Sequence, residues 1–72
     1  MDRQMLAEHL TLAEAHVEQG IRHIERQREI IAELARDGHD TASARDLLRQ
    51  FEETLKLHIG DRDRIVAELA QP

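Results

Sequence analysis

Apolar residues recur at alternating intervals of three and four positions along two long stretches of the chain. In the first stretch, two rows that each repeat every seven residues together give this spacing: Leu10, Val17, Ile24 and Ile31, and Leu6, Ala13, Gly20, Gln27 and Leu34. In the second stretch, the corresponding stripe is Ala44, Leu48, Phe51, Leu55, His58, Arg62, Ile65 and Leu69. These intervals are typical of the a and d positions of a heptad repeat. The pattern therefore predicts two long α-helices with a left-handed supercoil.

The expected fold class is all-α, with the whole chain, residues 1–72, forming one helical-hairpin domain. The helices are predicted at about 3–37 and 41–70, joined by a turn at 38–40. Asp2 suits the N-cap of the first helix, and Gly38 suits the left-handed position after its end. Asp40 or Thr41 can cap the second helix. Because the connection is short, the helices should be antiparallel neighbours.

A single hairpin of this length covers only part of each apolar face. Two-layer packing would need a second hairpin, so we expect a homodimeric four-helix bundle. Docking onto a different helical protein is the alternative. The interface residues are expected to be those of the apolar seam: Leu10, Val17, Ile24, Ile31, Leu48, Phe51, Leu55, Ile65 and Leu69.

Composition narrows the classes of partner. The chain has 15 acidic and 10 basic residues, a formal net charge of −5, one aromatic residue (Phe51) and no cysteine. The acidic balance and the near-absence of aromatic rings disfavour direct binding of nucleic acid. No apolar run approaches the roughly 20 residues of a membrane span, and the N-terminal pattern is amphipathic and unlike a signal peptide. Disulfides and thiolate metal sites are excluded, which fits a cytoplasmic protein.

Most of the sequence resembles a known group of proteins. The features concerned are Arg-Asp-Gly-His-Asp-Thr at 36–41, Leu-Leu at 47–48, Phe-Glu at 51–52 and His-Ile-Gly-Asp-Arg-Asp-Arg-Ile at 58–65. Together they resemble small uncharacterised helical-hairpin proteins of alphaproteobacteria. The resemblance implies a bacterial, cytoplasmic origin and carries no activity.

The predicted seam contains a polar layer near its middle. If residue numbers across the hairpin sum to about 77, His58 lies opposite Gly20, which leaves room for the imidazole. Arg62 then lies near Glu14 and Glu18, and in a hydrogen-bonded layer it would pair with one of them. The expected members of the cluster are His16, Gln19, Gly20, His23, His58 and Arg62, with Glu14 and Glu18 nearby.

This cluster has three interpretations. The first is a hydrogen-bonded layer that fixes register and oligomeric state. The second is a divalent-metal site formed by His16, His23 and His58. His9, His16 and His23 are seven residues apart, about 10 Å along a helix, so such a site needs His58 or a second chain. The third is an interface that responds to pH through its histidines.

No pattern in the sequence favours catalysis. Ser43 is the only serine, and it lies in a predicted first helical turn without an obvious base. Gly20, Gly38 and Gly60 are isolated and form no phosphate-binding loop. The sequence therefore favours a non-enzymatic, self-associating interaction or regulatory module without a cofactor. The alternatives are a metal-binding bundle and an acidic decoy that occupies a nucleic-acid-binding partner.

Overall fold

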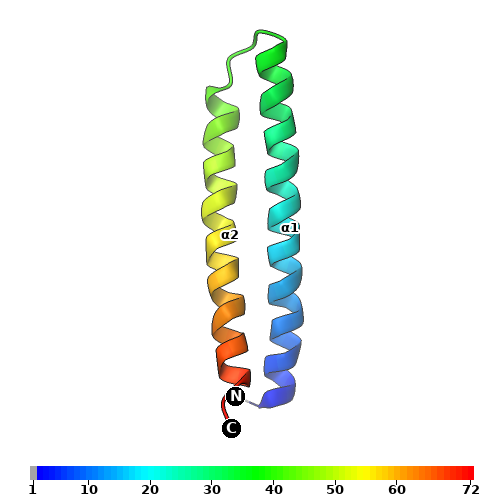
Figure 1. The fold of residues 1–72 in the computed structure, drawn as a ribbon, viewed down its shortest axis with the longest axis vertical. Helices are drawn as coiled ribbons and strands as arrows, with labels where there is room; N and C mark the ends of the chain where they lie inside the picture. Colours follow the sequence, from blue (N-terminus) through cyan, green and yellow to red (C-terminus); the bar gives the residue numbers. More distant parts are fainter. Residues whose placement is uncertain (1) are drawn as a thin grey trace.

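The structure is a computed structural model that describes residues 2–72. Two helices, α1 (Arg3–Arg36) and α2 (Ala42–Leu69), run antiparallel and side by side, with the start of α1 and the end of α2 at the same end of the hairpin (Figure 1). The molecule is a rod of 56 × 14 × 13 Å. The predicted two-helix hairpin is therefore confirmed. Each helix is slightly shorter than predicted at the turn, and α2 ends at Leu69.

Side-chain and backbone groups satisfy the helix ends at the open end of the hairpin. The Asp2 carboxylate accepts a hydrogen bond of 2.8 Å from the Gln4 backbone N–H, as expected for an N-cap. The Arg3 guanidinium donates to the backbone carbonyl oxygens of Leu69 and Gln71 at 3.0 and 3.3 Å. Carbonyls in the last turn of a helix have no partner within the helix, so Arg3 ties the two termini together.

The turn begins with a Schellman motif at the end of α1. Gly38 has a φ of 77°, and its N–H donates to the Ala35 carbonyl at 3.2 Å. The His39 N–H donates to the Leu34 carbonyl at 2.9 Å, which completes the motif. Asp40, not Thr41, supplies the cap of α2, because its carboxylate accepts from the Ala42 N–H at 3.0 Å.

The two helices meet along the predicted seam. In α1, the buried residues are Leu6, Ala13, Val17, Ile24, Gln27 and Ile31. In α2, every residue of the predicted stripe is half-buried, and none of the 28 residues of this helix, all of which the structure describes, is buried. The nine predicted interface residues are all buried or half-buried within the single chain. The seam is therefore one layer thick and remains open on both sides.

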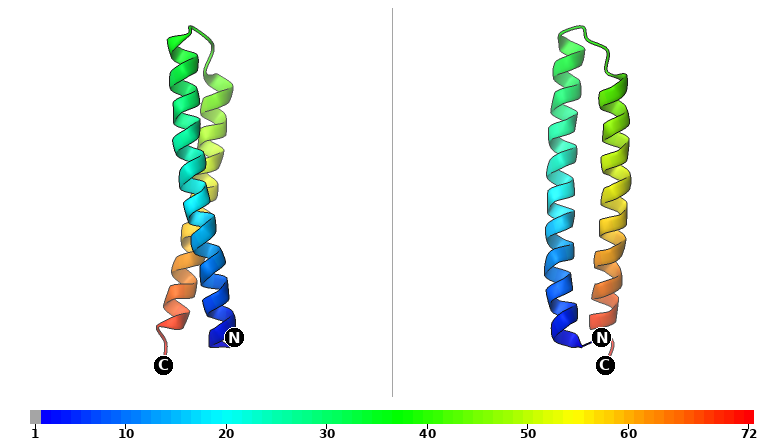
Figure 2. Two further views of the ribbon diagram at one scale, coloured as in Figure 1. Left: turned by 90° about the vertical axis from the view of Figure 1, so that its right-hand side faces the viewer. Right: turned by 180° about the vertical axis from the view of Figure 1, so that it is seen from behind.

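The register across the hairpin differs from the prediction. Contacts join Gly20 to Leu55, His16 to His58 and His23 to Phe51, so residue numbers across the seam sum to 74 or 75. The predicted value of about 77 assumed that the helices end level at the turn. Instead, α1 extends further toward the turn than α2 does, and the connection runs back along α1 before α2 begins (Figure 1). The two helices also cross at a small angle (Figure 2).

Candidate functional site

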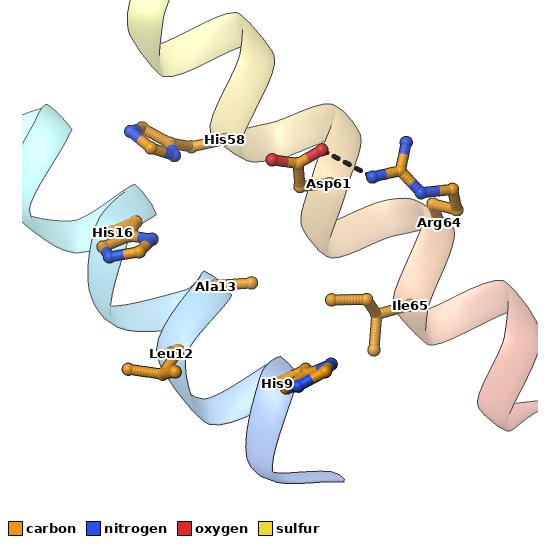
Figure 3. A pocket seen from close by; sticks show the side chains of 8 residues that line it. All are labelled: His9, Leu12, Ala13, His16, His58, Asp61, Arg64 and Ile65. Carbon is orange, nitrogen blue, oxygen red and sulfur yellow. Dashed lines mark hydrogen bonds and ion pairs between the residues drawn. The ribbon is translucent and has the colours of Figure 1, made fainter. Parts of the chain in front are cut away.

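Two histidines from different helices meet near the middle of the rod. The ring centroids of His16 in α1 and His58 in α2 are 4.9 Å apart, with an angle of 41° between the ring planes. Both rings line a groove of about 260 Å³ together with His9, Asp61 and Arg64 (Figure 3). The side chain of Arg64 donates a hydrogen bond of 2.6 Å to the Asp61 carboxylate, one helical turn from His58.

A second groove adjoins the first on the same side of the hairpin. Its volume is about 220 Å³, and its lining residues are His16, Gln19, Gly20, His23, Phe51, Thr54 and His58. The structure thus brings five members of the predicted polar cluster to one surface. The His23 ring lies against Phe51, with centroids 5.5 Å apart, and not against the other histidines.

The charged members of the predicted polar layer lie elsewhere. Arg62 forms an ion pair of 2.9 Å with its neighbour Asp63, so the expected pairing with Glu14 or Glu18 is wrong. Both glutamates are exposed. The reason is the register, since a sum of 75 moves α2 by about half a helical turn relative to the predicted alignment.

The same register shift changes the neighbour of Gly20. A Cβ atom added at Gly20 would lie 3.1 Å from Leu55 Cδ1 and 3.6 Å from Leu55 Cβ. Leu55, and not His58, therefore fills the space beside this glycine. The prediction that Gly20 makes room for the His58 ring is wrong, although both residues line the same groove.

The seam does contain one buried polar side chain, which the sequence pattern did not single out. Gln27 is 5% exposed, and its Nε2 donates to the Ala44 carbonyl oxygen at 2.8 Å. The bond joins the two helices near the turn. Polar residues at the seam positions of coiled coils specify register, and Gln27 occupies such a position. The register-fixing role that we predicted for the His58–Arg62 layer stays a prediction. The place of Gln27 in an otherwise apolar row was the available signal.

An apolar groove lies on the other side of the hairpin. Its volume is about 340 Å³, and its lining residues are Ile21, Ile24, Glu25, Arg28, Glu52, Leu55, Lys56 and Ile59. Ile21 in this groove is two residues after Gln19, which lines the groove beside His23. In the same way, Lys56 is two residues after Thr54. Two residues correspond to about 200° around a helix, which places the two grooves on opposite faces.

The structure does not bring the three predicted metal ligands together. Within residues 2–72, no group of three or more histidine, aspartate or glutamate side chains is arranged to hold a metal ion. His16 and His58 are in contact, whereas His23 packs on Phe51. The described chain thus offers a pair of imidazoles rather than a triad.

Charged side chains on the remaining surface pair locally. Arg26 lies 3.1 Å from Glu29, and Arg49 is hydrogen-bonded to Asp46. These exposed pairs add little stability, but they mix the two signs along the rod. A mixed surface does not favour the acidic-decoy interpretation, which needs a continuous acidic face.

Comparison with known protein families, with characterised proteins and with solved structures gives no match for this chain. The resemblance to alphaproteobacterial hairpin proteins therefore stays a prediction. Neither of the two described helices is long and apolar enough to cross a membrane.

Proposed function

We propose that this chain is a helical interaction module that works as a homodimer, in which a second copy covers the apolar groove and completes a four-helix bundle. The single observation that carries the proposal is the thinness of the core. Among the described residues 2–72, only five apolar residues are buried, and all of them belong to α1. Two helices of about 28–34 residues normally pack into a second layer, and the hairpin provides only one.

The surface area supports association with a partner of similar size. The rod exposes 5440 Å². A compact monomer of 8.3 kDa exposes about 4,600 Å² by the usual scaling of area with mass. The excess of about 850 Å² matches the area that each partner buries in a standard protein interface, about 800 Å².

The apolar groove is the face that suits a second copy best. Ile21 is 43% exposed, and it shares the groove with Ile24, Leu55 and Ile59. Val66 continues the row of Ile59 after two helical turns and is 48% exposed. An exposed apolar patch of this kind, surrounded by polar residues, is typical of a protein interface.

Charge at the groove also favours self-association. The chain has a net charge of −5, so two copies repel each other over most of their surface. The rim of the groove is neutral, because Glu25 and Glu52 are balanced by Arg28 and Lys56. Arg28 lies 3.9 Å from Glu52 across the seam. Within the part of the chain that the structure describes, Glu25 and Lys56 form no ion pair. A twofold axis would allow Glu25 of one copy to pair with Lys56 of the other.

The test is sedimentation equilibrium of the unmodified chain and two matched variants. We expect a mass of about twice 8.3 kDa for the unmodified chain. Ile59→Asp places a charge in the groove twice per dimer, and it should weaken association about 1,000-fold, from about 2 kcal/mol at each site. Leu57→Asp is the control, because Leu57 is 70% exposed and does not line the groove.

Circular dichroism tests whether a variant has lost association because it has unfolded. Both variants should retain the helical signal of the parent. A mass of 8.3 kDa for the unmodified chain at all concentrations would overturn the proposal. Equal loss of association in Leu57→Asp would show that the groove is not the interface.

A further inference from the structure

We propose that the two copies of the dimer are related by a twofold axis parallel to the rod, so that α1 of each copy packs over α2 of the other. This inference rests on the proposed function, because it concerns the face around the apolar groove. Both turns would then lie at one end of the bundle. The alternative is an axis across the rod, which places α1 over α1 and α2 over α2 and puts the turns at opposite ends.

The outer row of α1 on the groove side is acidic. Glu25 and Arg28 line the groove from this helix. Residues seven or fourteen positions earlier lie on the same side of a helix, which adds Glu18 and Glu14 to the row. Arg28 lies 3.9 Å from Glu52 of its own chain. Among the described residues 2–72, the three glutamates of this row form no ion pair, so the row presents negative charge.

The corresponding row of α2 is basic. Glu52 and Lys56 line the groove from this helix, and Arg45, Arg49 and Asp63 lie seven positions before or after them. The two acidic members of the row are each paired with an arginine of the same chain. Arg49 also pairs with an aspartate one turn before it. After these local pairs, the row of α2 still presents positive charge opposite in sign to the row of α1.

An axis parallel to the rod brings the two rows together at matching levels. Rotation about such an axis leaves every residue at its own level along the rod. Residues at one level of α1 and α2 have numbers that sum to 74 or 75, and the same sum then applies between copies. Glu18 lies level with residue 57, next to Lys56 of the second copy. Glu25 lies level with residue 50, and the nearest basic residues of that row are Arg49 and Lys56.

An axis across the rod gives the opposite electrostatic result. It places the acidic row of α1 against the same row of the second copy, so that Glu14, Glu18 and Glu25 face other glutamates. The basic rows of the two α2 helices meet in the same way. Like charges that face each other across an interface disfavour association. The distribution of charge along the groove therefore favours the axis parallel to the rod.

Charge reversal at Glu18 separates the two arrangements by the sign of its effect. With the axis parallel to the rod, Glu18→Lys meets Lys56 twice per dimer and should weaken association at least tenfold in sedimentation equilibrium. With the axis across the rod, the same change removes repulsion and strengthens association. Glu8→Lys is the matched control, because Glu8 is exposed and does not line the groove. It should not weaken association, and Glu18→Lys combined with Lys56→Glu should return to within about threefold of the parent.

Spin labels at the two ends of the rod give a second readout. Labels at His39→Cys in the turn and, separately, at Gln4→Cys near the start of α1 should each give a distance between copies shorter than half the rod's length of 56 Å. An axis across the rod cannot keep both distances short, because the two distances together would be about twice the rod's length. At least one of them would then reach about the full length of the rod.

The outcomes distinguish this inference from the proposed function. One distance near the full length of the rod would overturn the inference and leave the dimer intact. Stronger association of Glu18→Lys than of Glu8→Lys would do the same. A mass of 8.3 kDa for the unmodified chain at all concentrations would overturn the proposed function together with the inference.

Discussion

Replacement of Gly20 by alanine adds one methyl group where α1 packs against Leu55. The added Cβ would lie 3.1 Å from Leu55 Cδ1, so Leu55 must move by a few tenths of an ångström. Gly60 lies inside α2 and has no atom within 4 Å of the corresponding position. Alanine is favoured over glycine in a helix interior by about 1 kcal/mol. Gly60→Ala should therefore stabilise the hairpin by the full amount of about 1 kcal/mol.

The packing cost makes the gain smaller at Gly20. Overpacking a tight core costs about 1–3 kcal/mol. Leu55 is only half-buried and can rotate its terminal methyl group toward the groove, so the lower end applies. We therefore expect Gly20→Ala to stabilise the hairpin by at most about 0.5 kcal/mol. In thermal melts at one fixed protein concentration, Gly60→Ala should raise the melting temperature by about 4–8 °C, and Gly20→Ala by less than half as much.

A double-mutant cycle identifies the neighbour of Gly20. In a Leu55→Ala background, the full gain of about 1 kcal/mol should return to Gly20→Ala. In a His58→Ala background, the gain should stay small. The register would be refuted if Gly20→Ala were as stabilising as Gly60→Ala, or if its effect depended on His58 and not on Leu55.

Substitutions at two further positions test the buried bond and the turn. Gln27→Glu places an acceptor against the Ala44 carbonyl and should destabilise the hairpin by about 2 kcal/mol or more in urea unfolding. Gln27→Leu should cost less than 1 kcal/mol, because the apolar replacement leaves no unpaired polar group in the seam; equal losses would contradict a role for the bond. Gly38→Ala should cost about 1–2 kcal/mol, since its φ of 77° is strained for alanine, and an unchanged melting temperature would contradict the Schellman motif.

Much of the fold could be predicted from the sequence because heptad spacing is a strong signal. Both rows of α1 and the stripe of α2 follow from residue spacing alone. The N-cap at Asp2 follows from the preference of aspartate for that position. The left-handed glycine at the turn was predictable because few other residues adopt that conformation. These features depend on local backbone preferences and on which side of a helix is apolar.

The register could not be predicted as well, and the candidate site depended on it. Heptad spacing fixes which residues face the seam, but not how far α1 extends beyond α2 at the turn. The path of residues 37–41 sets that offset. A shift of two to three residues gives both His58 and Arg62 different neighbours on α1. The contact between His16 and His58 and the bond from Gln27 therefore required the structure.

The central claim is that a second copy covers the groove formed by Ile21, Ile24, Leu55 and Ile59. Because the chain has no cysteine, a single nitroxide label can be attached at an introduced cysteine and the distance between copies measured by pulsed electron resonance. A label at Lys56→Cys, on the rim of the groove, should give a shorter distance between copies than a label at Thr54→Cys on the opposite face. Absence of coupling between copies, or a shorter distance from Thr54→Cys, would contradict the account.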